Sequence, residues 1–227
     1  MSFITMFAKG GRYHPRLALP SGGMLANWDM SGGSGQSVAD RSGSAHPLQL
    51  GATTGADASD PVFTATGLTF DGATKYCTVP TIASLPVPFT ILAVFQVTGS
   101  GPRGLVACGG SSVAFYVSAT NKLELDKQNV ALVGAGASTV TGAAFLGAVT
   151  YDGSAWKIYK GSTLDGSGTN AQTMSASTPL VGAAPSAFFF NGTIYHVLIY
   201  SRILSGTEVA AAYASLKATW AGRGVSI

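Results

Sequence analysis

The chain alternates between short apolar segments and turns. The segments are rich in Val, Ile, Phe, Tyr and Thr, and Gly, Pro, Asn or Asp bounds them, as in FTILAVFQVT, AFLGAVTY and TIYHVLIY. Three dipeptides that tolerate positive φ predict hairpin turns, at Asp71-Gly72, Asp152-Gly153 and Asn191-Gly192. Many short strands with frequent turns predict an all-β fold, an antiparallel two-sheet jelly-roll sandwich, rather than alternating strands and helices.

One segment near the C-terminus has helical periodicity. Ser205 and Glu208 have the spacing of a capping box, in which each residue bonds the backbone N–H of the other. Arg202 precedes them, and we expect it to hold a carbonyl or a carboxylate. The apolar positions that follow share one helical stripe: Val209, Tyr213, Leu216 and Trp220. The sequence therefore predicts a C-terminal helix that packs by this stripe against the sandwich.

The length of 227 residues fits one β-sandwich domain, which we expect to span residues 23–227. Residues 1–22 are short, basic and interrupted by Gly and Pro, so we predict an N-terminal arm. Its candidate docking residues are Lys9, Arg12, Tyr13 and Arg16. The net charge is +3 without a long basic run, which gives nucleic-acid binding little support. No apolar stretch reaches ~18 residues, so no membrane span is predicted.

Charged residues make up only 10% of the chain, against roughly 25% in a typical globular protein. Such a surface is weakly hydrated and repels itself little. This composition favours an extracellular or particle-borne protein that buries further surface in a homo-oligomer. The alternative is a compact monomer with a neutral surface. Cys77 and Cys108 both lie in apolar runs, and we expect them to be buried thiols.

The order of several motifs resembles the laminin-G-like, concanavalin-A-like jelly-roll family over about residues 24–220. The matching pieces are Trp28-Asp29, Asp40-Arg-Ser-Gly43, GLTFDG at 67–72, VTYDG at 149–153 with KIYKG at 157–161, and IYSRILS at 199–205 ending at Glu208-Val209. This resemblance implies the same sandwich that the strand pattern predicts. It also implies relatives that bind carbohydrate, relatives that hydrolyse it, and many structural proteins of bacteriophages.

The stretch NKLELDK carries two acids, Glu124 and Asp126, which a strand would place on one face, while Leu123 and Leu125 face the other way. Laminarinase-like relatives carry a third acid further along such a strand. Here Gln128 or Asn129 stands in its place, and an amide is neither a general acid nor a carboxylate nucleophile. We therefore assign no catalytic residue. The pair is either the solvated face of a strand or a set of sugar-binding acceptors.

Trp156 follows the turn at Asp152-Gly153 and is the third candidate binding residue, because an exposed aromatic ring can stack on a sugar. Its alternation with Ile158 and Lys160 also allows a buried position. Calcium sites in similar folds suggest Asp71, Asp152 and Asn191, but each precedes Gly, where its usual role is to shape a turn. We therefore predict no metal site and no cofactor.

These observations favour a non-enzymatic surface protein of a virion, either a capsid-decoration or a tail-fibre component. Its arm would dock onto other virion proteins, with a cell-surface glycan as a further partner. Few charges, no recognisable signal peptide and the family resemblance support that hypothesis. The protein would then assemble in the host cytoplasm and reside in the virion, or, alternatively, be extracellular. The alternative function is a carbohydrate-binding lectin module, and the least favoured is a glycoside hydrolase.

Overall fold

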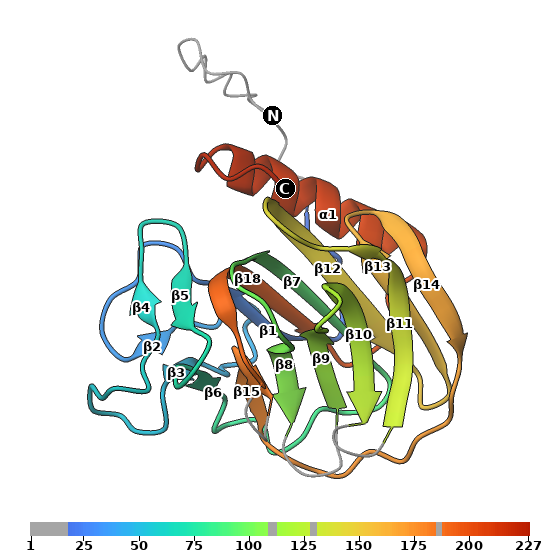
Figure 1. Ribbon diagram of the computed structural model, residues 1–227, viewed down its shortest axis with the longest axis horizontal. Helices are drawn as coiled ribbons and strands as arrows, with labels where there is room; N and C mark the ends of the chain where they lie inside the picture. The colour runs from blue at the N-terminus through green and yellow to red at the C-terminus, as the bar shows by residue number, and fades with distance from the viewer. Residues whose placement is uncertain (1–17, 109–112, 128–130, 185–187) are drawn as a thin grey trace, which may run out of the picture.

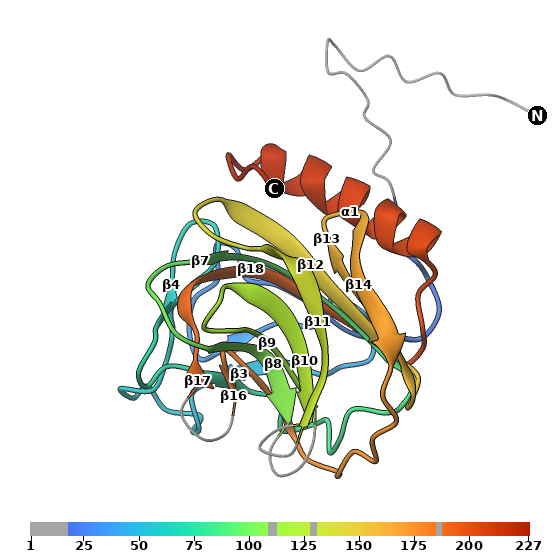
Figure 2. The ribbon, with the colours of Figure 1, turned by 45° about the vertical axis from the view of Figure 1, so that its right-hand side comes forward.

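The computed structural model describes residues 18–108, 113–127, 131–184 and 188–227. Two antiparallel sheets lie face to face, and one helix covers the outer side of the first sheet (Figures 1 and 2). Sheet A contains, in spatial order, β14 (Thr163–Thr169), β13 (Ala155–Lys160), β12 (Ala144–Tyr151), β7 (Phe89–Val97), β18 (Asn191–Tyr200), β5 (Leu68–Asp71) and β4 (Val62–Phe63), with β1 (Met24–Asp29) also paired to β18. The predicted all-β jelly-roll sandwich is confirmed.

Sheet B forms the second layer. Its strands, in spatial order, are β11 (Ala131–Thr139), β10 (Lys122–Lys127), β9 (Val113–Val117), β8 (Arg103–Cys108), β15 (Pro179–Val181), β6 (Cys77–Thr78), β3 (Leu48–Leu50) and β2 (Ser37–Val38). A small hairpin of β16 (Ala183–Ala184) and β17 (Phe188–Phe189) follows β15 in the chain. Cys77 and Cys108 lie buried in this sheet and do not form a disulfide with each other, as the sequence predicted.

Strand β7 shows why an apolar run without alternation suits this fold. Phe89, Ile91 and Phe95 point into the core between the sheets. Leu92 and Val94 point the other way, into a second apolar cluster beneath the helix. A strand that is covered on both faces carries apolar side chains on both, so its sequence is continuously hydrophobic. The apolar run of β7 therefore fits its position at the centre of sheet A.

Helix α1 (Gly206–Ala221) begins at the predicted capping box. Ser205 Oγ accepts a hydrogen bond from the Glu208 backbone N–H, and the Glu208 carboxylate accepts one from the Ser205 N–H. Arg202 Nη2 lies 2.6 Å from Glu208 Oε1 and also donates to the carbonyl oxygen of Ser21, which confirms its expected role. The buried side of the helix consists of Val209, Ala212, Leu216 and Trp220 and packs on the outer face of sheet A.

The two sheets meet along one side, where β11 lies against β13 and β14; we call the contact of Ala131–Thr139 with Thr163–Thr169 the seam (Figure 1). Glycine permits the close approach. A Cβ at Gly166 would lie 2.5 Å from the Ala135 carbonyl oxygen, and one at Gly136 would collide with the Asp165 carboxylate. Alternate glycines in facing edge strands therefore set the distance between the sheets here.

The three turn predictions have different outcomes. Asp152-Gly153 does connect β12 to β13 as a hairpin. Asp71-Gly72 forms a turn at the end of β5, with Gly72 at φ +76°, but not the predicted hairpin, because the next strand, β6, belongs to sheet B. The prediction at Asn191-Gly192 is wrong, because both residues begin β18 and pair with Asp71 and Phe70. Gly192 is needed there because a Cβ would collide with the Gln96 carbonyl oxygen of β7.

Candidate functional site

The outer face of sheet B is only partly covered. The β16–β17 hairpin lies over β8, where Ala184 packs against Ala107 and Ala114. A Cβ at Gly104 would collide with the hairpin backbone, so β8 carries a small residue at the contact. The hairpin cover reaches as far as Tyr116 of β9, whose ring stacks on Phe188 with centroids 6.3 Å apart and planes at 19°. Next to Tyr116, the polar positions of β10 begin.

Glu124 and Asp126 lie on this outer face, as the alternation of NKLELDK predicts. In register, Glu124 is opposite Tyr116 and Asp126 is opposite Ala114, whereas Leu123 and Leu125 are buried in the core. The Tyr116 hydroxyl donates to Glu124 Oε2 at 2.5 Å. On the other side, Leu132 of β11 is paired with Asp126 and is 51% exposed. We call Tyr116, Glu124, Asp126 and Leu132 the acidic face.

The two carboxylates of the acidic face differ in their surroundings. Burial, followed by the charge of Glu124, raises the pKa of Asp126 to about 6. Asp126 Oδ1 is buried and has no hydrogen-bond partner among the residues that the structure describes. Burial and the hydrogen bond to Glu124 raise the pKa of Tyr116, so its hydroxyl stays a donor at neutral pH. The face therefore presents a hydrogen-bond acceptor next to an aromatic ring.

Trp156 does not join the acidic face. Its indole packs under β11, where a Cβ at Gly134 would collide with it, and beside β14, where a Cβ at Gly168 would lie 3.0 Å from it. Gly134 is paired with Leu125, which points into the core, whereas Glu124 is paired with Ala135 and points outward. Trp156 and Glu124 thus lie on opposite faces of sheet B, with the indole half-buried against the core.

The predicted docking residues Lys9, Arg12, Tyr13 and Arg16 lie outside the described residues. The last part of the predicted arm is described: Leu19 packs against the cluster beneath the helix, and Arg202 holds the carbonyl oxygens of Ser21 and Gly22. These contacts tie the chain just before β1 to the start of α1. The arm itself stays a prediction.

The two aspartates considered as calcium ligands accept hydrogen bonds from the backbone of the turns in which they lie. Burial alone would raise the pKa of Asp71, but hydrogen bonds from Thr74, Ala73 and Lys75 outweigh it and lower the pKa. Asp152 accepts the N–H groups of Ser154 and Ala155. Within the four described ranges, no group of three or more His, Cys, Asp or Glu side chains is arranged to hold a metal ion. In those same ranges, no helix has the length and apolar character needed to span a membrane.

The sequence analysis missed Tyr116 and Phe188 as neighbours of the acids. Tyr116 occupies the outward position of SVAFYVS, where Phe115 and Val117 are the buried ones. Period-two alternation could have placed Tyr116 outward, but its pairing with Glu124 depends on strand register. Phe188 comes from a hairpin that is 72 residues further along the chain (188 − 116). No local pattern links it to β9.

The chain shows clear similarity to known proteins at the level of fold. A family model of laminin-G type, described as the concanavalin A-like lectin/glucanases superfamily, matches residues 71–210. A search of curated proteins found no match. The expected laminin-G-like family is therefore supported by a sequence model that covers more than half of the chain.

Several solved structures share the sandwich. A Trypanosoma rangeli sialidase in complex with 2,3-difluorosialic acid has a TM-score of 0.67 at 16% identity, over 88% of this chain and 34% of that one. Domain 4 of AbnA, an extracellular arabinanase from Geobacillus stearothermophilus in complex with arabinotriose, has a TM-score of 0.60 at 14% identity, over 84% and 98%. The chain thus spans about a third of the sialidase and nearly all of the arabinanase domain. At these identities the likeness shows the fold.

These comparisons contradict the interpretation of the chain as a virion surface protein. The similar structures named above are a sialidase and an arabinanase domain that was solved with a sugar, and neither is a virion component. The interpretation was wrong because low charge and the family resemblance fit a carbohydrate-binding module as well as a virion protein, and so did not distinguish them. The alternative, a carbohydrate-binding module, fits the comparisons better.

Proposed function

The chain belongs to the concanavalin A-like lectin/glucanases superfamily, and from this premise we propose that it is a carbohydrate-binding module that does not cleave its ligand. The observation that carries the proposal is the acidic face, where Glu124 and Asp126 stand beside Tyr116 on the side of the sandwich opposite the helix. The implied partner is an extracellular or cell-surface glycan.

The chemistry of the acidic face suits sugar hydroxyls. A carboxylate accepts hydrogen bonds from two neighbouring hydroxyls, and such charge-assisted bonds are about twice as strong as neutral ones. An aromatic ring beside them covers the apolar C–H face of a sugar. The position of Glu124 is fixed by the Tyr116 hydroxyl, which reduces the conformational entropy lost on binding. Leu132 borders the carboxylates with exposed apolar surface.

Binding without cleavage is favoured by the acids of β10. Glycoside hydrolysis requires two carboxyl groups that flank the scissile bond. Similar hydrolases carry a third acid further along the strand, and here Gln128 and Asn129 follow instead. Glu208, the other glutamate of the chain, is engaged by the capping box and by Arg202. We therefore assign Glu124 and Asp126 as hydrogen-bond acceptors for sugar hydroxyls and not as a catalytic pair.

A glycan array followed by calorimetry tests the proposal. We expect the full chain to bind at least one glycan, and the Glu124→Gln and Asp126→Asn variants to bind it at least tenfold more weakly. Asp152→Asn is the matched control, because it removes the same charge at an exposed turn where an amide oxygen can still accept the Ser154 and Ala155 N–H groups. Failure to bind any glycan, or equal loss in the control, would contradict the proposal.

The same ligand also tests the absence of turnover. Prolonged incubation with the chain is expected to leave the glycan intact, as measured by the release of reducing ends. Cleavage that disappears in Glu124→Gln would replace the proposal with the hydrolase hypothesis.

A further inference from the structure

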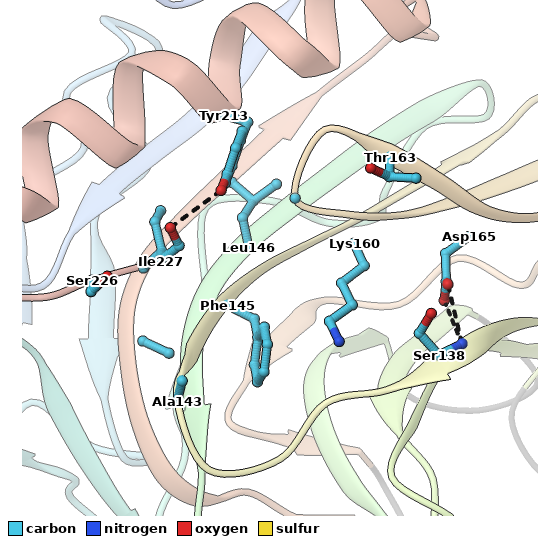
Figure 3. A pocket seen from close by; sticks show the side chains of 12 residues that line it. Ser138, Ala143, Phe145, Leu146, Lys160, Thr163, Asp165, Tyr213, Ser226 and Ile227 are labelled. Atoms are coloured by element: carbon cyan, nitrogen blue, oxygen red, sulfur yellow. Dashed lines mark hydrogen bonds between the residues drawn. The ribbon is translucent and has the colours of Figure 1, made fainter.

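A second hollow, separate from the acidic face, lies at one end of the seam beneath the helix (Figure 3). Its volume is about 480 Å³, within the ~300–1,000 Å³ that small-molecule sites occupy. Its walls come from β11, the start of β12, the β13–β14 hairpin, α1 and the segment after the helix. The side chains that matter below are Ser138, Phe145, Lys160, Thr163, Asp165 and Tyr213. We call this hollow the seam cavity.

Two charged groups in the seam cavity are held in place by the neighbouring sheet. Lys160 Nζ donates to the Thr139 carbonyl oxygen at 2.7 Å and lies 4.6 Å from the centroid of the Phe145 ring. Both oxygens of Asp165 accept the Ser138 backbone N–H at 3.1 Å. Each group keeps unused capacity, since an ammonium has three N–H donors and a carboxylate about four acceptor sites. A fixed donor and a fixed acceptor therefore border one space.

Two aromatic rings also border the seam cavity. Figure 3 shows Phe145 on the β12 side and Tyr213 reaching in from α1. The Tyr213 hydroxyl donates to the Ile227 carbonyl oxygen at 3.2 Å, which fixes its ring. Gly161 lies close to this ring, because a Cβ there would be 3.4 Å from Tyr213 Cζ. The hydroxyl groups of Ser138 and Thr163 complete the polar lining.

We propose that the seam cavity is a second binding site, for one residue of a neutral saccharide. The charged side chains of the lining are one lysine and one aspartate, whose opposite charges favour a neutral ligand over an acidic or a basic one. Aromatic rings suit the C–H faces of a sugar, and the fixed donor and acceptor suit its hydroxyls. The ligand class follows the proposed function, whereas the site is distinct from the acidic face and is tested separately.

Backbone amide shifts of the full chain test the proposal by NMR. The probes are arabinotriose and the methyl glycosides of glucose, galactose, mannose and xylose. We expect at least one probe to shift the amides of Phe145, Lys160, Gly161 and Asp165 in a saturable way. Lys160→Met keeps the stem over Phe145 and removes the donor, so it should weaken this binding at least tenfold.

A second variant keeps the test valid if Lys160→Met loosens the seam. Thr163 is exposed, and Thr163→Trp should fill the cavity mouth without removing the Lys160 or Asp165 contacts. Binding in the cavity is expected to be lost in Thr163→Trp and kept in Glu124→Gln. Shifts confined to Tyr116, Glu124 and their neighbours would overturn the cavity proposal and leave the proposed function standing. Shifts at neither place would overturn the cavity proposal, whereas the proposed function is decided by the glycan array.

Discussion

Arg223, just beyond the C-terminal helix, forms a bidentate ion pair with Asp29 at the end of the first strand. Its Nη1 and Nη2 lie 2.8 and 2.9 Å from the two carboxylate oxygens. The side chain of Asp29 is only 3% exposed, whereas Arg41, its other ionic partner, is 57% exposed. Burial alone would raise the pKa of Asp29, but the bonds from Arg223 and Ser31 outweigh it and hold the pKa below its usual range. The Arg223–Asp29 ion pair therefore connects β1, the first strand, to the segment that follows α1.

Loss of the Arg223–Asp29 ion pair should destabilise the domain. Arg223→Ala leaves a buried carboxylate with weaker compensation, so we expect the free energy of unfolding to fall by about 2–3 kcal/mol. Arg41→Ala is the control and should cost at most ~1 kcal/mol because its guanidinium is solvated. Chemical denaturation of both variants measures the difference. Equal effects would mean that the bidentate geometry contributes nothing beyond a surface ion pair.

Adding one methyl group at the seam should be costly. In Gly134→Ala the new Cβ would collide with the Trp156 indole, and overpacking of this kind lowers the free energy of unfolding by about 1–3 kcal/mol. Gly55→Ala is the matched control, because nothing lies within 4 Å of a Cβ there. Thermal unfolding distinguishes the two. A Gly134→Ala variant as stable as the control would show that Trp156 moves freely at this contact.

Buried His196 should make the domain sensitive to acid. Burial lowers its pKa to about 4; the Asp29 charge opposes this shift, and Arg223 and Arg41 add to it. The unfolded chain therefore binds more protons between about pH 4 and 6.5, so stability is complete above pH 6.5 and falls towards pH 4. The shift corresponds to ~3 kcal/mol at ~1.36 kcal/mol per pKa unit.

A glutamine at this position separates the proton effect from packing. His196→Gln can still place an amide nitrogen near Asn27 Oδ1, which His196 Nε2 contacts at 2.8 Å. We expect its unfolding free energy to depend less on pH between 4 and 6.5 than that of the wild type. An unchanged slope in His196→Gln would contradict the assignment.

Asp126 should change the pH dependence of stability in the direction opposite to that of His196. With its pKa raised to about 6, the folded chain binds more protons than the unfolded chain between about pH 4 and 6. Its contribution therefore favours folding in acid and is lost as pH rises through 6. Asp126→Asn is expected to raise the melting temperature above pH 6 and to leave it unchanged below pH 4. A lower melting temperature at pH 7 would mean that the carboxylate makes a stabilising contact when charged.

Local patterns predicted the parts of the fold that depend on neighbours in sequence. The capping box at Ser205 and Glu208 and the outward position of Glu124 follow from spacing alone, because helix and strand periodicity determine them. Tyr213 was expected on the buried stripe, yet it is only half-buried and lines the seam cavity. An apolar stripe predicts which side of a helix is buried, but not the shape of the surface against which that side packs.

Long-range contacts account for what the sequence did not predict. Asp165 reaches Ser138 across 27 residues, and Trp156 lies under β11 because Gly134 and Gly168 leave space for its ring. One signal was present: glycines alternate at 134 and 136 and again at 166 and 168, a pattern that marks close backbone approach in strands. Which two glycine strands approach each other depends on the topology of both sheets.

The seam also has a consequence for self-association. Three side chains from β13, β14 and the residue after β14 bond backbone groups along the outer edge of β11: Asn170 donates to the Leu132 carbonyl oxygen, Asp165 accepts the Ser138 N–H, and Lys160 donates to the Thr139 carbonyl oxygen. These side chains obstruct the addition of a foreign strand to β11, while the opposite border of sheet B ends in the two-residue strand β2 and that of sheet A in β4 and β1. At the seam, a protein with few repelling charges is thereby protected from strand addition by geometry instead of electrostatics.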